Sequence, residues 1–137
     1  MYRVLTVVVL AFAAIGCHPG MIGPHDFTAP APGKINHVVF FDLTDPGESD
    51  ELIDDCYELL EIPGAVSGYA GKHYDIGRDS ILSDYDVGFF VAFDSEEDYR
   101  AYVGHTAHIA LVEKWKPRWD SIRVYDVGDH WRVMRDQ

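Results

Sequence analysis

Two histidines and one tyrosine have the side-chain types and the spacing for acid–base chemistry in an apolar cavity. His108 begins an apolar i, i+3, i+4, i+7 pattern that ends at Trp115, so its imidazole lies on the apolar face of an expected helix. Tyr102 precedes His108 by six residues, just under two helical turns. His37 alternates with apolar residues of an expected strand and can share their inward face. An imidazole and a phenol that face one cavity can remove a proton beside a carbonyl group and stabilise the resulting oxyanion.

The same side chains are compatible with two other roles. They can be packing and hydrogen-bonding residues of a domain without catalytic activity. Together with His105, His37 and His108 also offer three imidazoles, enough in number for a metal site. No cysteine or carboxylate stands nearby in the sequence to complete such a ligand set. We therefore expect neither a resident metal nor a cofactor, and a histidine-based metal or haem site is kept as an alternative.

Composition and charge exclude several classes of partner. The chain has 137 residues, 47% of them hydrophobic, which is ordinary for one folded globular domain beyond any targeting segment. Its 11 lysines and arginines against 23 aspartates and glutamates give a net charge of −12. Nucleic acid and anionic lipid both require a basic surface, so we expect no nucleic-acid partner and no electrostatic docking on a membrane. The glycines match neither a P-loop nor a dinucleotide-binding turn.

Periodicity from residue 35 onward predicts the elements that must position the histidines and the tyrosine. They are a strand over 35–43, a helix from Ser49 to about residue 62, strands over 65–74 and 85–93, a second helix broken near Gly104 and ending by Pro117, and a strand over 121–127. Ser49 and Ser95 are the expected helix caps, because each precedes an acidic first turn. The order β-α-β-β-α-β predicts an α+β, ferredoxin-like fold with the helices on one face of the sheet.

The uncovered face of such a sheet carries apolar side chains that a monomer would expose to water. Val38 and Phe40 in the first strand and Phe90 in the third point to this face by alternation. Exposed apolar patches usually mark binding surfaces, and two copies packed sheet to sheet would bury this one. We therefore predict a homodimer through Val38, Phe40 and Phe90.

The first residues have the features of a bacterial export signal. A short positive start precedes an apolar run over 4–15, which is shorter than the ~20 residues needed to span a bilayer. The run ends at Ala14-Ile15-Gly16-Cys17, which is similar to a lipobox, where the cysteine becomes lipidated. The following stretch is rich in proline and glycine, as in a flexible spacer.

These features divide the chain into four parts. We predict a signal peptide over 1–16, a lipidated Cys17 with its spacer over 17–34, the folded domain over 35–128 and a tail over 129–137. The alternative for the first part is an ordinary cleaved signal peptide that contains a cysteine without lipidation. The lipid would then be the only contact with the membrane, because the domain is acidic. The predicted location is the bacterial cell envelope, on the periplasmic or extracytoplasmic side.

Four segments of the domain resemble the stress-responsive A/B barrel (Dabb) family. They are Asn36-His37-Val38-Val39-Phe40-Phe41, Ile62-Pro63-Gly64-Ala65-Val66, the stretch GFFVAFDSEED over 88–98, and Tyr102-Val103-Gly104-His105-Thr106-Ala107-His108. The last is similar to a Tyr-x-x-His-Pro-x-His signature, with Thr106 at the proline position. The resemblance covers about residues 35–127 and implies a dimeric α/β barrel.

The resemblance also implies roles for the candidate residues. A plant branch of the family includes a cofactor-free polyketide cyclase that uses the matching histidine and tyrosine. For this chain it implies His108 as the base, Tyr102 as the group that polarises a carbonyl, and His37 as an orienting group. Much of the family has no assigned reaction. We therefore expect a small apolar ligand or a structural role under stress, with a cofactor-independent lyase or cyclase as the alternative.

Overall fold

The computed structural model describes residues 30–130. Its elements are, in chain order, β1 (Ile35–Leu43), the 3-10 turn η1 (Pro46–Glu48), α1 (Ser49–Leu59), β2 (Ala65–Lys72), β3 (Val87–Phe93), α2 (Glu96–Val103), α3 (Thr106–Trp115) and β4 (Trp119–Gly128). The expected signal peptide, Cys17, and most of the spacer and the tail lie outside the described residues, so these assignments stay predictions. Within residues 30–130, no helix combines the length and the hydropathy that crossing a membrane requires.

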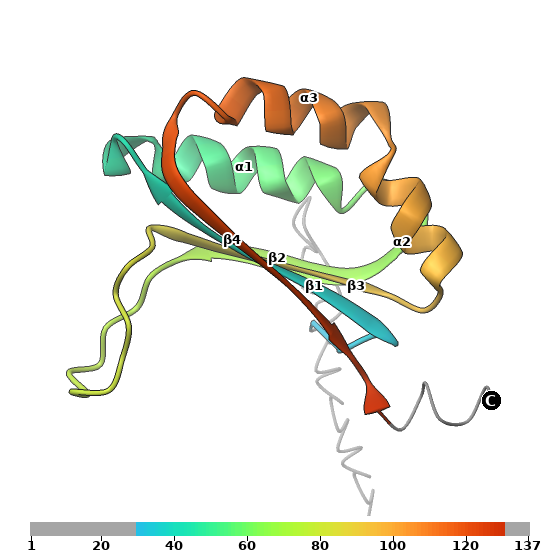
Figure 1. The fold of residues 1–137 in the computed structure, drawn as a ribbon, viewed down its shortest axis with the longest axis horizontal. Helices are drawn as coiled ribbons and strands as arrows, with labels where there is room; N and C mark the ends of the chain where they lie inside the picture. Colours follow the sequence, from blue (N-terminus) through green and yellow to red (C-terminus); the bar gives the residue numbers. More distant parts are fainter. Residues whose placement is uncertain (1–29, 131–137) are drawn as a thin grey trace, which may run out of the picture.

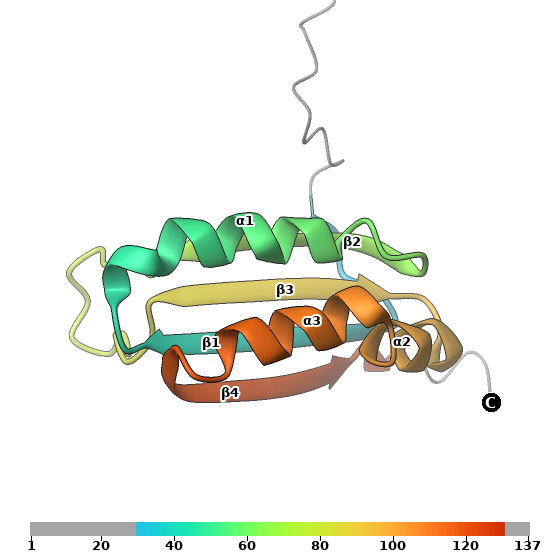
Figure 2. The ribbon, with the colours of Figure 1, turned by 90° about the horizontal axis from the view of Figure 1, so that it is seen from above.

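The four strands form one antiparallel sheet in the order β2-β3-β1-β4. Helices α1, α2 and α3 all lie on one side of this sheet, and the other side is left without a helix (Figure 1). Seen from above, α1 runs beside β2 while α3 runs over β1 and β4 (Figure 2). The predicted α+β, ferredoxin-like fold with its helices on one face is therefore confirmed.

The core lies between the covered face of the sheet and one stripe of each long helix. Its members come from β1 and β3 (Val39, Phe41, Leu43, Val87, Phe89, Val91, Phe93), from α1 (Leu52, Cys56, Leu59) and from α3 (Leu111, Trp115). Each large apolar side chain buried in this way contributes about 1.5–3 kcal/mol to folding. Cys56 is fully buried and packs as an apolar residue, and burial raises the pKa of its thiol.

The first helix begins at Ser49, as predicted, but its capping differs from the prediction. Asp45 provides the cap in place of Ser49, because its carboxylate accepts a hydrogen bond from Gly47 N at 2.9 Å and starts η1. Pro46 follows at the first helical position, where its missing N–H costs nothing. Ser49 is instead the buried first residue of α1, and its hydroxyl donates to Pro46 O at 2.7 Å.

The second helical stretch is divided into α2 and α3, as predicted. Ser95 caps α2 by accepting a hydrogen bond from Asp98 N at 3.0 Å. The chain then breaks at Gly104, and His105 caps α3, with its Nδ1 accepting a hydrogen bond from Ala107 N at 3.2 Å. The break lets α2 and α3 point in different directions above the sheet (Figure 1).

The connection between β2 and β3 forms an arm (residues 73–86) that extends past the sheet on its open side (Figure 1). β2 and β3 are shorter than predicted because the chain leaves the sheet after Lys72 and rejoins it at Val87, whereas β4 starts earlier, at Trp119. The polar sequence of this connection predicts a solvated His73, and that prediction is wrong. Its two ring nitrogens are buried, and the ring packs edge-on against Tyr85 at a centroid distance of 5.1 Å.

Candidate functional site

A cavity of about 290 Å³ lies between the covered face of the sheet and helices α2 and α3. Most of its lining is apolar and comes from β1, β4 and α3: Val39, Phe41, Leu111, Val112, Trp119, Ile122 and Val124. Its polar lining includes His37 from β1, Tyr99 and Tyr102 from α2, and His108 from α3. An apolar wall with a few convergent polar groups is the usual character of a small-molecule site. The structure thus brings the three predicted residues, His37, Tyr102 and His108, to one cavity, while their roles stay predictions.

Tyr102 lines this cavity and carries a buried hydroxyl group. Its side chain is fully buried, and its hydroxyl has no hydrogen-bond partner among residues 30–130. The ring is held between Phe93 and His108, at centroid distances of 4.9 and 5.1 Å. Burial, with smaller contributions from Cys56 and Tyr99, raises the pKa of Tyr102, so the phenol keeps its proton. A buried hydroxyl without a partner costs about 1–3 kcal/mol, which a ligand with an acceptor atom would offset.

His108 is held as a neutral imidazole beside Tyr102. It is half-buried, and burial is the main reason that the pKa of His108 lies below its ordinary value of 6.5. The nearby His37 lowers the pKa of His108 further, whereas a hydrogen bond with the Val103 backbone acts in the opposite direction. At neutral pH the ring therefore has an unprotonated nitrogen and carries no charge.

The lowered pKa of His108 predicts a loss of stability in acid. The unfolded chain keeps the ordinary pKa near 6.5, so below that pH it binds more protons at His108 than the folded chain does. Stability contributed by neutral His108 is thus present above pH 6.5 and is lost as the pH falls through the lower folded pKa. We expect the melting temperature of His108→Gln to fall less than that of the wild type between pH 7.5 and pH 5. An equal fall in melting temperature for the wild type and His108→Gln would contradict this expectation.

His37 has two partners, Asp126 and Tyr99, that are not among the site residues predicted from the sequence. Its Nδ1 lies 2.8 Å from Asp126 Oδ1, and the Tyr99 hydroxyl donates to both carboxylate oxygens of Asp126 at 2.9 Å. The Tyr99 oxygen also lies 3.2 Å from His37 Nδ1. Burial, followed by the hydrogen bond to Asp126, raises the pKa of Tyr99 to about 12, so this phenol also stays protonated.

Two sequence signals for these partners exist. Asp126 follows Ile122 and Val124 at alternate positions, so it is a carboxylate on an otherwise apolar strand face. Tyr99 precedes Tyr102 by three residues, close to one helical turn. Neither signal indicates that the two side chains meet at His37, because that depends on the pairing of β1 with β4.

The three-imidazole metal site is not supported by this arrangement. His105 is exposed and uses its ring nitrogen to cap α3, so it does not converge with His37 and His108. Among residues 30–130, no cluster of three or more histidine, cysteine, aspartate or glutamate side chains is close enough together to hold a metal ion.

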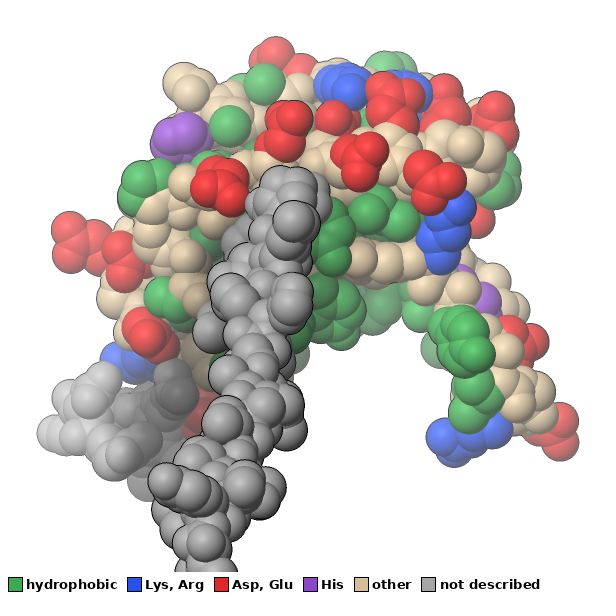
Figure 3. Space-filling view, turned by 180° about the vertical axis from the view of Figure 1, so that it is seen from behind, with side chains coloured by type: hydrophobic (Ala, Val, Ile, Leu, Met, Phe, Trp, Pro, Cys, Tyr) green, Lys and Arg blue, Asp and Glu red, His purple; other side chains and the backbone are tan. Residues whose placement is uncertain are grey.

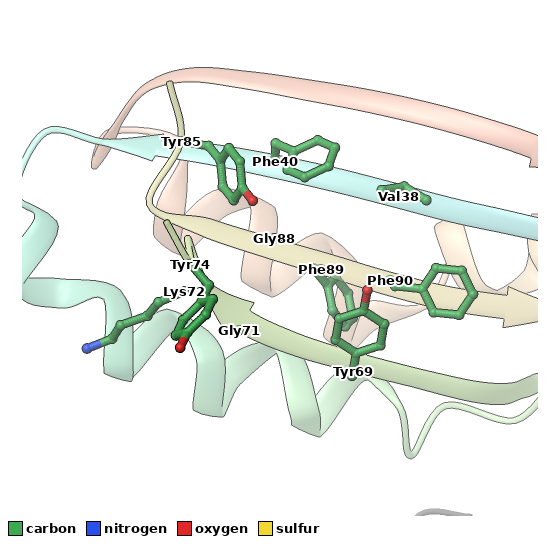
Figure 4. Close-up of a pocket in the computed structure, with 10 residues that line it drawn as sticks. All are labelled: Val38, Phe40, Tyr69, Gly71, Lys72, Tyr74, Tyr85, Gly88, Phe89 and Phe90. Carbon is green, nitrogen blue, oxygen red and sulfur yellow. The ribbon is translucent and has the colours of Figure 1, made fainter. Parts of the chain in front are cut away.

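The open face of the sheet carries a second concentration of apolar side chains. A hollow of about 260 Å³ lies there at the base of the arm, and Phe40, Tyr69, Tyr85 and Phe90 stand around it (Figure 4). Val38 lines the same hollow, so the three residues predicted for a dimer face all lie on the open side. Viewed from behind, hydrophobic side chains gather beneath the sheet beside the arm (Figure 3).

Comparison with protein families gives one match that spans the folded domain. Residues 35–129 match the model of the Stress responsive A/B Barrel Domain, or Dabb. The chain belongs to the Dabb family. A search of curated proteins found no match for this Dabb protein.

Several proteins of known structure share the fold of this Dabb protein. A Dabb family protein with a ferredoxin-like fold from Mesorhizobium loti is 24% identical, with a TM-score of 0.58 over 69% of this chain and 95% of that one. A dimeric ferredoxin-like protein of unknown function from Thermobifida fusca is 22% identical, with a TM-score of 0.59 over 77% and 99%. Hydroxynitrile lyase from Passiflora edulis is 16% identical, with a TM-score of 0.63 over 73% and 96%. At these identities the likeness concerns the fold.

Proposed function

We propose that this Dabb protein binds a small, mostly apolar carbonyl compound in the cavity between the sheet and helices α2 and α3. The observation that carries the proposal is the Tyr102 hydroxyl, which is fully buried in the cavity wall and has no partner among the described residues. A carbonyl oxygen of the ligand would accept its hydrogen bond. The apolar wall would hold the rest of the molecule, and a volume of about 290 Å³ suits a small one.

The second candidate function is cofactor-free proton abstraction from such a ligand. Tyr102 would stabilise the oxyanion that forms, and a neutral imidazole in the same cavity would take the proton. The family resemblance assigns this base to His108, whose lowered pKa leaves it unprotonated at neutral pH. The fold is shared with a hydroxynitrile lyase, which supports a lyase-type reaction as a class.

The test of ligand binding compares two probes of the same shape, phenylacetone and isobutylbenzene, of which the first alone has a carbonyl group. We expect the wild-type chain to bind phenylacetone about 2- to 10-fold more tightly, the usual net value of one hydrogen bond. Tyr102→Phe should remove this preference and leave the affinity for isobutylbenzene unchanged, because the ring is kept. Titration followed by NMR measures both dissociation constants.

The matched control for Tyr102→Phe is Tyr69→Phe, which removes a hydroxyl from the open face, far from the cavity lining. The control should keep the preference for phenylacetone. An equal affinity of the wild type for the two probes, or no binding of either, would overturn the proposed function.

We also infer that two copies of this Dabb protein pair through the open face of the sheet. Val38, Phe40 and Phe90 line a hollow there that no helix covers. Tyr69 on the same face is half exposed, at 50%. Contact of these aromatic side chains with water is unfavourable, and a second copy packed against the open face would exclude the water. The dimeric state described for the relative from Thermobifida fusca supports this pairing.

A further inference from the structure

Two glycines form the floor of the hollow at the base of the arm, on the open face of the sheet. Gly71 in β2 is paired with Gly88 in β3, and Gly88 is paired with Phe40 in β1. Because neither glycine has a side chain, a depression is left in the sheet beside the stacked rings of Tyr69 and Phe90. A glycine inside a strand often marks a place where another molecule approaches the backbone closely.

The space above Gly71 is open in a single copy. A methyl group at this position would have no heavy atom within 4 Å, its two chain neighbours apart, and the φ of Gly71 is not positive. Its backbone conformation therefore does not require glycine, and glycine weakens a strand relative to alanine. The close approach of a second molecule to the strand is a physical reason for glycine here.

The arm (residues 73–86) forms a wall beside this hollow. It leaves the sheet after Lys72 and extends past it on the open side (Figure 1). Tyr74 and Tyr85 of the arm line the hollow together with the two glycines of its floor (Figure 4). The sheet and the arm thus bound the hollow from two directions.

The arm carries three large apolar side chains that a single copy exposes to water. Tyr74 is 81% exposed, Leu82 74% and Ile76 62%. These are the most exposed large hydrophobic residues in the part of the chain that the structure describes. Apolar side chains gathered on one projection mark an interaction surface, because their contact with water is unfavourable.

The root of the arm is fixed by hydrogen bonds and one ion pair. Asp86 N donates to Phe41 O at 2.8 Å, and Asp86 Oδ2 accepts a hydrogen bond from Leu43 N at 2.8 Å. Arg123 on β4 forms an ion pair with Asp84 at 2.7 Å and donates to its backbone oxygen at 2.8 Å. An element that is fixed before binding loses little freedom on binding. The arm is therefore preorganised to contact a partner on the open side.

A second copy of this chain fits these features as the partner. The arm projects from the same face through which we infer that two copies pair, so a copy seated on Val38, Phe40 and Phe90 lies beside the arm. Lys72 is the one charged residue among those that line the hollow. Two copies with a net charge of −12 each can therefore meet here without bringing carboxylates together.

We propose that the arm and the glycine-floored hollow form a socket that holds a second copy of this chain. The open face of the partner packs on the floor, and the partner also covers Tyr74, Ile76 and Leu82 of the arm. In a symmetric pair each copy provides one socket and fills the other, so every contact occurs twice. This inference rests on the proposed pairing through the open face and adds the arm as the second part of the interface.

Hydroxyl-radical footprinting of the full chain, read by mass spectrometry, tests whether the arm is covered in the pair. Phe40→Asp, which places a charge on the open face, supplies the monomer for comparison. We expect Tyr74, Ile76 and Leu82 to react about threefold or more slowly in the wild type than in this variant. Ile109, exposed on α3, should react equally in both. Equal reactivity of the arm in the two proteins would overturn the proposal.

Sedimentation equilibrium measures what the arm contributes to pairing. Ile76→Ser and Leu82→Ser shorten side chains that are exposed in a single copy, so each variant should stay folded. Each should raise the dissociation constant of the pair by about 10- to 100-fold, because the apolar contact is lost twice. Ile109→Ser makes the same kind of change on α3 and should keep the dissociation constant of the wild type.

Gly71→Phe tests the floor of the hollow. In a single copy the added ring meets open space, whereas in the pair it would occupy the place of the partner. We expect a folded protein, by circular dichroism, whose dissociation constant is higher by about 100-fold or more. Ala101→Phe adds the same ring to the exposed side of α2 and should leave the dissociation constant unchanged.

The outcomes separate the socket from pairing itself. Dissociation constants equal to that of the wild type in both arm variants, or in Gly71→Phe, would overturn the socket. If Phe40→Asp is then still monomeric, pairing through the open face stands without the arm. A wild type that is monomeric at micromolar concentration would overturn both.

Discussion

Replacing Phe40 with aspartate is expected to convert the proposed dimer into monomers without unfolding the domain. In one copy the Phe40 ring is half-buried on the open face, with Tyr85 at a centroid distance of 4.7 Å, so a carboxylate at this position can reach water. Between two copies the carboxylate would be buried without a partner, at a cost of about 3–5 kcal/mol each. Because a symmetric dimer holds two of them, the dissociation constant should rise by about 10⁴-fold or more. Sedimentation velocity measures the change in mass.

The control for Phe40→Asp is Ile109→Asp, which adds the same charge to the exposed side of α3. It should leave the dimer intact, because α3 lies on the opposite side of the sheet from the open face. Circular dichroism should show folded protein for both variants. A wild type that sediments as a monomer at micromolar concentration would refute pairing through Val38, Phe40 and Phe90.

Replacing Trp115 with alanine is expected to lower the free energy of unfolding by about 4 kcal/mol. Trp115 is fully buried at the end of α3, and its Nε1 donates to Asp55 Oδ2 on α1 at 2.6 Å. The Arg118 guanidinium covers the ring, with its carbon 3.9 Å from the centroid. The substitution therefore removes a large apolar contact and leaves a cavity between α1, α3 and the sheet. Urea unfolding at one fixed protein concentration measures the difference.

Trp115→Phe separates packing from the hydrogen bond to Asp55. It keeps an aromatic ring in the core but removes the indole N–H, so we expect a smaller loss of about 1–2 kcal/mol. A loss of less than about 1 kcal/mol in the free energy of unfolding for Trp115→Ala would contradict the prediction. The contact between α1 and α3 at Trp115 would then contribute little to stability.

Local sequence patterns were enough to predict the elements of this Dabb protein. Alternating side chains over 35–43 predict β1 with its bounds as observed, and the Ser95 cap and the break at Gly104 are both present. Such patterns repeat every two or 3.6 residues, so they can be recognised without knowing what packs against them. The start of α1 at Ser49 is as predicted, but the capping role of Ser49 was wrong, because Asp45 caps the preceding turn η1 and Ser49 is buried as the first residue of α1.

These local patterns do not predict which segments contact one another in the folded domain. His73 stands in a polar stretch of sequence, but the arm folds back and buries its ring against Tyr85. The ends of β2 and β3 were likewise set by where the arm leaves the sheet. The burial of His73 and the ends of β2 and β3 both depend on how the arm closes between the two strands. The path of such a loop is not specified by its local composition.

The amino-acid sequence by itself determined that three polar side chains face the cavity: His37, Tyr102 and His108 each lie on an inward face because of their place in a strand or helix period. Only the tertiary structure decided how the two histidines differ. The register of β1 against β4 puts Asp126 opposite His37, and α2 brings Tyr99 to the same carboxylate, while His108 is left in an apolar setting. The reason is physical: periodicity is local, whereas the environment of a titratable group is set by strand pairing and helix packing across the whole domain.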